Sequence, residues 1–259
     1  MRLVLLLFVL ALAGNPARAA AQDCGSAREA FTARAYAAKP DNVLPLRSGW
    51  SRAPAAGACR IWPAHPDLTL LAVPIWQHSD EPDARNGDLE VLVVDSADAS
   101  VKAWTVLRGA ADSDAVRFEG VGLDTARYRL DAAHWTFGIR TQLSGSSGPN
   151  PYAETRLVLI AYAPGRLQVL TQPISMEIHQ GEWDTRCAGE FDATTRTLEV
   201  GQPRENGFAD LIVRERAVHR RSAVVDGSCE QADAPAVLRS HRLRHDGRSY
   251  PLLDALSPY

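Results

Sequence analysis

The sequence has almost no lysine, and it lacks the short motifs of the common catalytic and nucleotide-binding chemistries. Lys39 and Lys102 are its only lysines, so nearly all of the 28 basic residues are arginines. There is no H-E-x-x-H zinc motif, no P-loop and no G-x-G-x-x-G fingerprint. The formal net charge of -3 reflects no excess of basic residues. Nothing here therefore predicts a nucleic-acid partner or an anionic membrane surface.

Long apolar runs are also absent, apart from one at the N-terminus. The run over residues 3–13 follows the positive Met1-Arg2, and it is shorter than the about 20 residues that a membrane-spanning helix needs. Small residues with A-x-A spacing end this segment at Ala21. We therefore predict a cleaved signal peptide over residues 1–21, a periplasmic location and no membrane insertion.

Only four cysteines are present, and no two of them form a C-x-x-C pair. A zinc site would bring its ligands at short spacing, so Cys24, Cys59, Cys187 and Cys229 predict two disulfides instead. Three pairings are possible, and we favour the sequential one, Cys24 with Cys59 and Cys187 with Cys229. Each bond would then close a loop of about 35 to 45 residues. By restricting the unfolded chain, each would stabilise the fold by about 4 kcal/mol.

The N-terminal part of the mature chain predicts one short helix. A capping-box pattern begins at Ser26, and apolar residues then recur at helical spacing. Residues 41–66 are rich in proline, glycine and alanine, and they are predicted to be a connecting segment that Cys59 ties down. Residues 22–64 thus form a predicted helical cap and linker tied by a disulfide, and residues 65–259 a predicted β domain.

Beyond this linker the pattern changes to that of short strands. The predicted strands span residues 68–76, 88–95, 101–107, 115–123, 126–131, 134–142, 154–162, 166–172, 174–179, 195–200, 209–219, 237–245 and 249–253. Turn signals such as Asp226-Gly227 separate them, and 88–95 with 101–107 is the clearest hairpin. Because no helices intervene, we predict a mainly β fold, an antiparallel sandwich or barrel-like sheet with a short N-terminal helix.

Residues of catalytic type are present without a catalytic motif. The segment Gly145-Ser146-Ser147-Gly148 is one residue short of the nucleophile elbow G-x-S-x-G. A serine hydrolase would have to combine Ser146 or Ser147 with His179 and Asp184. A glycosidase would need two carboxyl groups about 5 to 9 Å apart. The carboxylates that cluster in the sequence are Glu177, Glu182, Asp184, Glu190 and Asp192. We expect them to be solvated residues of a β face, and we expect no catalytic residue.

Three further groups of residues have both a functional and a structural interpretation. They are His241 with His245; the run Arg214, Arg216, Arg220 and Arg221; and Trp183 with Cys187. The histidines could ligate a metal, but we expect them to be exposed on a solvated strand. The arginines could meet an anionic partner, although a solvated face is favoured. The tryptophan is expected to pack on a disulfide in the core rather than to form a sugar platform. No metal or cofactor is expected.

The segment SGSSGPNPY over residues 144–152 is of a different kind. Its small polar residues cannot anchor a core, its prolines restrict the chain, and Tyr152 offers a rigid amphipathic contact. Such a loop suits recognition, and it equally suits an ordinary hairpin loop with Tyr152 folded onto the sheet. The candidate partner-binding residues are Ser144, Ser146, Ser147, Gly148 and Tyr152.

The pattern FGIR-x-x-x-SGSSG-x-NPY, with GEWD-x-x-CAGEF after it, resembles the periplasmic inhibitors of i-type (invertebrate) lysozyme and their exported bacterial relatives. The resemblance covers roughly residues 65–200, with the helical cap and C-terminal strands in 201–259 as additions. In such inhibitors a Ser-Gly loop followed closely by a tyrosine enters the lysozyme cleft, where the serine hydroxyl meets the catalytic carboxyls. The matching positions are Ser147, Gly148 and Tyr152, with Ser144-Gly145 as a second register.

The sequence thus predicts an exported periplasmic protein that binds without catalysis. The resemblance makes inhibition of an i-type lysozyme the most specific hypothesis. A binding or assembly module of the cell envelope, with a bacterial protein or a glycan as its partner, is the alternative. A secreted hydrolase ranks third.

Overall fold

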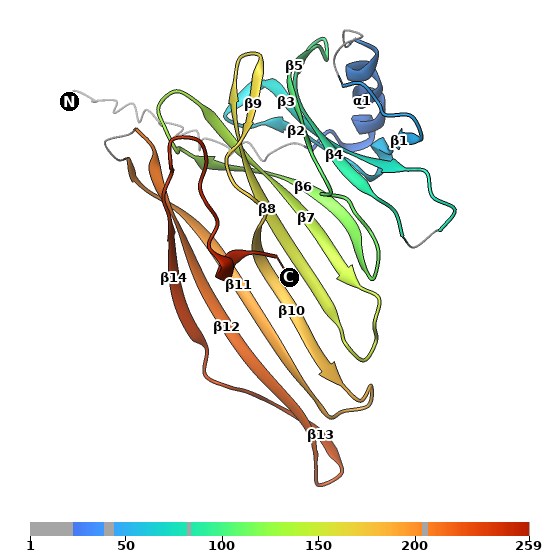
Figure 1. Cartoon of the computed structure of the whole chain (residues 1–259), viewed down its shortest axis with the longest axis vertical. Helices are drawn as coiled ribbons and strands as arrows, with labels where there is room; N and C mark the ends of the chain where they lie inside the picture. The colour runs from blue at the N-terminus through green and yellow to red at the C-terminus, as the bar shows by residue number, and fades with distance from the viewer. Residues whose placement is uncertain (1–22, 39–43, 82–83, 204–206, 259) are drawn as a thin grey trace, which may run out of the picture.

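The protein consists of two antiparallel sheets and one short α-helix, so the prediction of a mainly β fold is confirmed (Figure 1). The computed structural model describes residues 23–38, 44–81, 84–203 and 207–258, and the predicted signal peptide lies outside these ranges. Over the described ranges neither sheet closes into a barrel, so the arrangement is sandwich-like. No helix in the described part of the chain is long and apolar enough to span a membrane.

The smaller sheet is built around its longest strand. Its strands are β1 (Trp50–Arg52), β2 (Ala58–Trp62), β3 (His65–Gln77), β4 (Gly87–Asp95) and β5 (Val101–Leu107). β4 pairs with both β3 and β5, which confirms the predicted hairpin. β1 and β2 pair with the other edge of β3, with a 3-10 turn between them. The prediction of a plain connecting segment over 41–66 is wrong here, because β3 supplies hydrogen-bond partners that a sequence pattern does not reveal.

The larger sheet carries the rest of the chain. Its strands are β6 (Val116–Tyr128), β7 (Trp135–Gly145), β8 (Tyr152–Ala163), β9 (Arg166–Val169), β10 (Ile174–Trp183), β11 (Gly189–Pro203), β12 (Ala209–Val225), β13 (Ser228–Asp233) and β14 (Val237–Leu243). They follow the order β6-β7-β8-β10-β11-β12, with β9 beside β8. β13 and β14 share one edge of β12, each along a different stretch of it.

The strand predictions for the larger sheet need three corrections. The predicted strands 115–123 and 126–131 form the single strand β6, which bends through irregular register against β7. The predicted strand 249–253 contributes only one bridge, between Thr171 and Tyr250. β13 was not predicted. The turn at Asp226-Gly227 is confirmed, since both residues have positive φ (48° and 79°), as a two-residue hairpin requires.

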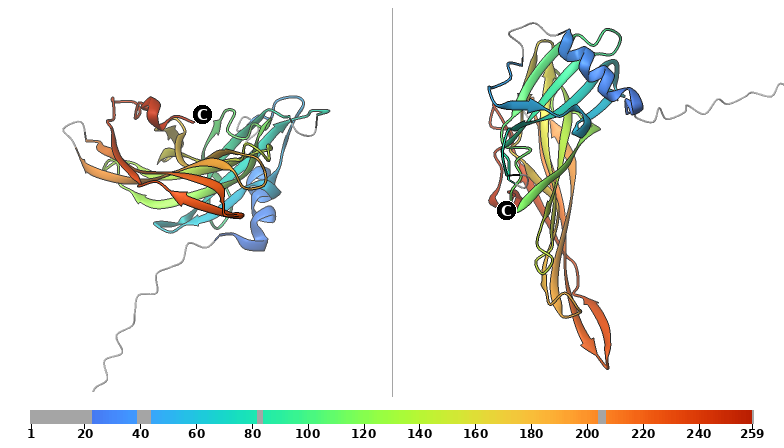
Figure 2. Two further views of the ribbon diagram at one scale, coloured as in Figure 1. Left: turned by 90° about the horizontal axis from the view of Figure 1, so that it is seen from below. Right: turned by 90° about the vertical axis from the view of Figure 1, so that its right-hand side faces the viewer.

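Three apolar clusters hold these layers together, and the alternation of β8 separates two of them. Val158 and Ile160 pack with Leu70 and Val91 between the two sheets. Leu157 and its alternate neighbours face the other way and are covered by the chain segment that follows β14. The third cluster lies under the helix. The far end of the larger sheet, where β13 lies, projects beyond the smaller sheet (Figure 2).

The helix α1 (Arg28–Ala37) lies against the outer side of the smaller sheet (Figure 1). A 3-10 turn at Gly25–Ala27 precedes it, so Ser26 lies inside that turn and the predicted capping box does not form. Both predicted disulfides are confirmed. The Cα atoms are 5.5 Å apart in Cys24–Cys59, which ties the helix to β2, and 5.7 Å apart in Cys187–Cys229.

A buried carboxylate on β4 joins the helix to the smaller sheet. Glu90 is 1% exposed, and Arg52 of β1 grips it with two hydrogen bonds, from Nε to Oε2 at 2.6 Å and from Nη2 to Oε1 at 2.9 Å. The Tyr36 hydroxyl of α1 donates to the same Oε2 at 2.6 Å. Burial and the Glu90 charge raise the pKa of Tyr36 far above its usual value, so this hydroxyl remains a donor.

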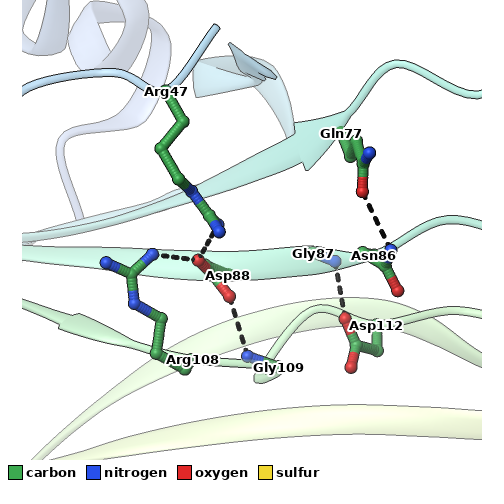
Figure 3. A network of polar contacts seen from close by, with 8 residues as sticks. All are labelled: Arg47, Gln77, Asn86, Gly87, Asp88, Arg108, Gly109 and Asp112. Carbon is green, nitrogen blue, oxygen red and sulfur yellow. Dashed lines mark hydrogen bonds and ion pairs between the residues drawn. The ribbon is translucent and has the colours of Figure 1, made fainter. Parts of the chain in front are cut away.

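A second buried carboxylate, Asp88, lies two residues before Glu90 at the start of β4. Asp88 receives Arg47 from the segment before β1 and Arg108 from the end of β5, and its Oδ1 accepts the Gly109 N–H at 2.8 Å (Figure 3). One step along the strand, Asp112 Oδ1 accepts the N–H of Gly87 at 2.6 Å. Through Asp88, the central strand β4 is thus linked to the segments next to both edge strands, β1 and β5.

The Arg52→Ala variant should lose about 3 to 5 kcal/mol in free energy of unfolding, because it leaves the Glu90 carboxylate buried without a counter-charge. Urea denaturation at neutral pH measures this. The matched control is Arg214→Ala, which breaks an exposed pair with Glu199 and should cost less than about 1 kcal/mol. Equal losses in the two variants would contradict the importance assigned to Glu90.

Candidate binding loop

The predicted recognition segment is divided between two strands and the loop that joins them. β7 continues to Gly145 and β8 begins at Tyr152, so the loop itself spans residues 146–151. Every residue from Ser146 to Asn150 is exposed. Because β7 and β8 are long, the loop lies at the far end of their hairpin, beyond the smaller sheet (Figure 1).

The loop is held against the end of β10 by three hydrogen bonds. Trp183 donates its indole Nε1–H to the Gly148 carbonyl at 2.8 Å and its backbone N–H to the Pro149 carbonyl at 3.0 Å. The Gly181 N–H donates to the Pro151 carbonyl at 3.2 Å. Sequence reasoning did not find this support, although the GEWD part of the quoted pattern contains both donor residues.

Inside the loop the two adjacent serines differ. Ser146 hydrogen-bonds back to the Ala115 carbonyl through its N–H at 3.2 Å and its hydroxyl at 3.3 Å. Ser147 Oγ instead accepts the Asn150 N–H at 3.1 Å, which leaves the hydroxyl hydrogen available to donate outward. At the tip, a Cβ added to Gly148 would meet nothing within 4 Å. Among the exposed loop residues, Ser147 therefore offers a hydroxyl donor and Gly148 the most open approach.

A cavity of about 620 Å³ opens beside the loop, and its far wall is acidic. The loop serines line it together with Glu182, Glu190 and Asp192. Glu182 and Glu190 are direct cross-strand partners, and His219 Nδ1 lies 2.9 Å from Asp192 Oδ1. The cavity therefore offers several carboxylate acceptors to a donor or cationic group of a partner.

The remaining two candidate residues are engaged within the protein. The Tyr152 hydroxyl donates to Oε2 of Glu154 at 2.8 Å, and Arg156 grips the same oxygen. Burial and this carboxylate raise the pKa of Tyr152 to about 12. The Ser144 hydroxyl donates to Glu119. Tyr152 is thus folded onto the sheet at the start of β8, as the structural interpretation of the segment predicted.

The residues considered for a hydrolase do not come together. Ser147 Oγ is paired with Asn150, while Asp184 Oδ1 accepts the N–H groups of Arg186 and Cys187, which lower the pKa of Asp184. By strand alternation His179 points to the opposite side of β10 from Glu182, which lines the loop cavity. No hydrogen bond between two members of the trio exists among the described residues.

Of four structural interpretations made for charged and aromatic residues, two are confirmed and two are wrong. The clustered carboxylates and the four arginines are all exposed, as predicted. The histidines are not: His245 is 7% exposed and stacks on Phe208, and His241 Nε2 lies 3.5 Å from Glu215, so the prediction of exposed histidines is wrong. Trp183 is half-exposed and contacts the loop, which overturns its assignment to a disulfide core.

Within the described ranges no group of three or more His, Cys, Asp or Glu side chains could hold a metal ion. Comparisons with protein-family models, with curated proteins and with solved structures find no match.

The Trp183→Phe variant keeps an aromatic ring but removes the indole N–H that holds the Gly148 carbonyl. We expect faster amide hydrogen exchange in residues 146–151 and a loss of about 0.5 to 1.5 kcal/mol in stability. Trp104→Phe, a half-buried tryptophan of the smaller sheet, is the control and should leave exchange in the loop unchanged. Unchanged loop exchange in Trp183→Phe would contradict the assigned role of the indole.

Proposed function

We propose that this protein is an exported, periplasmic binding protein that acts without catalysis, and that the 146–151 loop is its binding element. Inhibition of a lysozyme is the most specific form of this proposal. The observation that carries it is the attachment of an exposed Ser-Gly tip to β10 through three hydrogen bonds. A loop held in one conformation loses little entropy on binding, which is the usual advantage of protein inhibitors over flexible peptides.

The chemistry of Ser147 fits a cleft that contains two carboxyl groups. Its oxygen accepts the Asn150 N–H, and the hydroxyl hydrogen remains available to an acceptor outside the loop. Glycosidases place two carboxyls on either side of the scissile bond, and one of them is a carboxylate that accepts hydrogen bonds. Insertion of the tip would then occupy the position of the substrate, and Gly148 allows close approach because it has no side chain.

The acidic wall beside the loop bears on the choice of partner. Glu182, Glu190 and Asp192 would repel an acidic surface around the cleft and attract a basic one. Complementary charge at the rim of an interface mainly increases the association rate and selects among partners. A lysozyme with a basic rim around its cleft is therefore the expected target, and its inhibition should weaken as salt concentration rises.

The direct test is a titration of lysozyme activity on cell-wall substrate with the purified protein, repeated across lysozyme classes. Ser147→Ala should weaken binding to the sensitive class by about 1 to 3 kcal/mol, since a buried carboxylate loses its donor. Gly148→Val should weaken it further through steric exclusion, while the free protein tolerates the added methyl groups at this open position.

Ser51→Ala, an exposed serine on β1, is the matched control and should inhibit like the wild type. Melting temperatures of all variants should agree, which separates loss of binding from loss of folding. Wild-type inhibition in Ser147→Ala and Gly148→Val would remove the loop from the proposal. Failure of the wild type to inhibit any lysozyme class would remove the inhibitor function and leave the envelope module as the alternative.

A further inference from the structure

A second cavity, of about 630 Å³, lies at the opposite end of the β7–β8 hairpin from the loop. The turn between β2 and β3 forms one wall, and the end of β6 with the turn into β7 forms the other. β7 leads from Trp135 at this cavity to Gly145 at the loop, and ten residue steps of a strand measure about 33 Å. The two places are therefore too far apart to act on one small ligand.

One wall of the cavity is a layered group of aromatic rings. Trp62 is 2% exposed, and it contacts His65 and Trp135 edge to face, with ring centroids 4.9 and 6.0 Å apart. His65 stacks on Trp135 at 3.2 Å with the planes 13° apart, and Tyr162 lies 5.8 Å from the same indole. These contacts hold the Trp135 ring in one orientation.

Trp135 is nevertheless 43% exposed. His65 covers one face of the indole, and part of the remaining ring surface lines the cavity. Leaving a large aromatic surface in water forgoes the free energy that its burial would provide. A rigid, half-covered indole at the wall of a cavity is thus a flat apolar platform for a ligand with a matching apolar face.

The opposite wall supplies positive charge. Arg127 and Arg129 line the cavity and are exposed, and neither forms an ion pair or a side-chain hydrogen bond with any described residue. The carboxylate of Asp131 is already committed: it accepts His134 Nδ1–H at 2.8 Å and the N–H groups of Ala133 and His134. The Asp131 side chain is only 10% exposed, so two exposed guanidiniums face a ligand against one largely buried carboxylate. The net positive charge of the cavity favours a carboxylate over a cation.

We propose that this cavity binds a carboxylate-bearing sugar residue of a glycan. A pyranose ring has a face of C–H groups that stacks on an indole, and its rim of hydroxyls requires polar neighbours. Trp135 provides the platform, and Thr125 and His134 are polar residues that line the same cavity. The carboxylate pairs with Arg127 and Arg129. This site is separate from the proposed lysozyme-binding loop and does not depend on it.

The experiment titrates the full-length mature protein with a panel of acidic oligosaccharides, containing glucuronic, galacturonic, mannuronic or muramic acid. Each is paired with its carboxyl-reduced neutral counterpart. Calorimetry gives the affinity, and quenching of tryptophan fluorescence reports contact with the indole. We expect at least one acidic oligosaccharide to bind about tenfold or more tightly than its neutral counterpart, with quenching that Trp135→Ala abolishes.

The double variant Arg127→Gln/Arg129→Gln should erase the preference for the acidic form by weakening its binding about tenfold or more. Both arginines are exposed, so this variant folds even where Trp135→Ala does not. Arg117→Gln, an exposed arginine at the other end of β6, is the matched control and should bind like the wild type. Ser147→Ala should also bind sugar normally, which separates this site from the loop.

Three outcomes would overturn the proposal: no member of the panel binds, the neutral counterparts bind as tightly as the acidic forms, or the double arginine variant keeps the wild-type preference. Tighter binding of a nucleotide such as AMP than of every sugar would overturn the proposal as well. That result would mean that a nucleotide base, and not a sugar ring, stacks on Trp135. Failure of the protein to inhibit any lysozyme would not contradict sugar binding at this cavity, because the two sites are separate.

Discussion

Buried carboxylates held by arginines are the constraint on which much of this structure depends. Glu90, Glu154 and Glu215 are each 5% exposed or less, and each has at least one arginine within hydrogen-bonding distance. A buried carboxylate without such a partner would cost several kcal/mol. The Arg52–Glu90 and Arg196–Glu215 pairs also join different strands, so a wrong register would separate their charges. These ion pairs therefore favour the observed strand register over shifted registers.

The near absence of lysine suits this design. A guanidinium is planar, carries several donors and is more weakly hydrated than an ammonium group, so it can serve a carboxylate and a backbone carbonyl at once. Arg196 is an example: it donates to Glu215, to the Ser175 carbonyl at 2.6 Å and to the Ala255 carbonyl at 2.8 Å. One side chain thereby fastens the C-terminal segment over the larger sheet, where Tyr250 and Leu256 complete the apolar cluster.

The parts of the fold that could be predicted are those with a local signal. The β4–β5 hairpin has two apolar runs and a short turn, and Asp226-Gly227 has the residues that positive φ requires. β13 was missed because all of its residues are exposed, so it has no alternation to read. The burial of His241 depends on Glu215, a contact between strands that no spacing in the sequence reveals.

The same limit applies to the candidate site. The Ser/Gly segment was found because small polar residues and prolines interrupt two strands. That Tyr152 lies on the sheet follows from the position of Glu154, two residues along the same strand face, and this could have been suspected from alternation. The hydrogen bonds from Trp183 to the loop could not have been predicted, because they depend on how β10 lies beside the β7–β8 hairpin.

The Cys187–Cys229 bond lies at the end of the larger sheet that has no second layer (Figure 2). Around it β13 is wholly exposed and Val224 is 62% exposed, so water competes for the ladder hydrogen bonds and little apolar burial opposes fraying. The bond restrains the turn that contains Asp184, directly after Trp183, which holds the loop. This covalent bond therefore restrains the exposed end of the sheet at a place where none of the three apolar clusters reaches it.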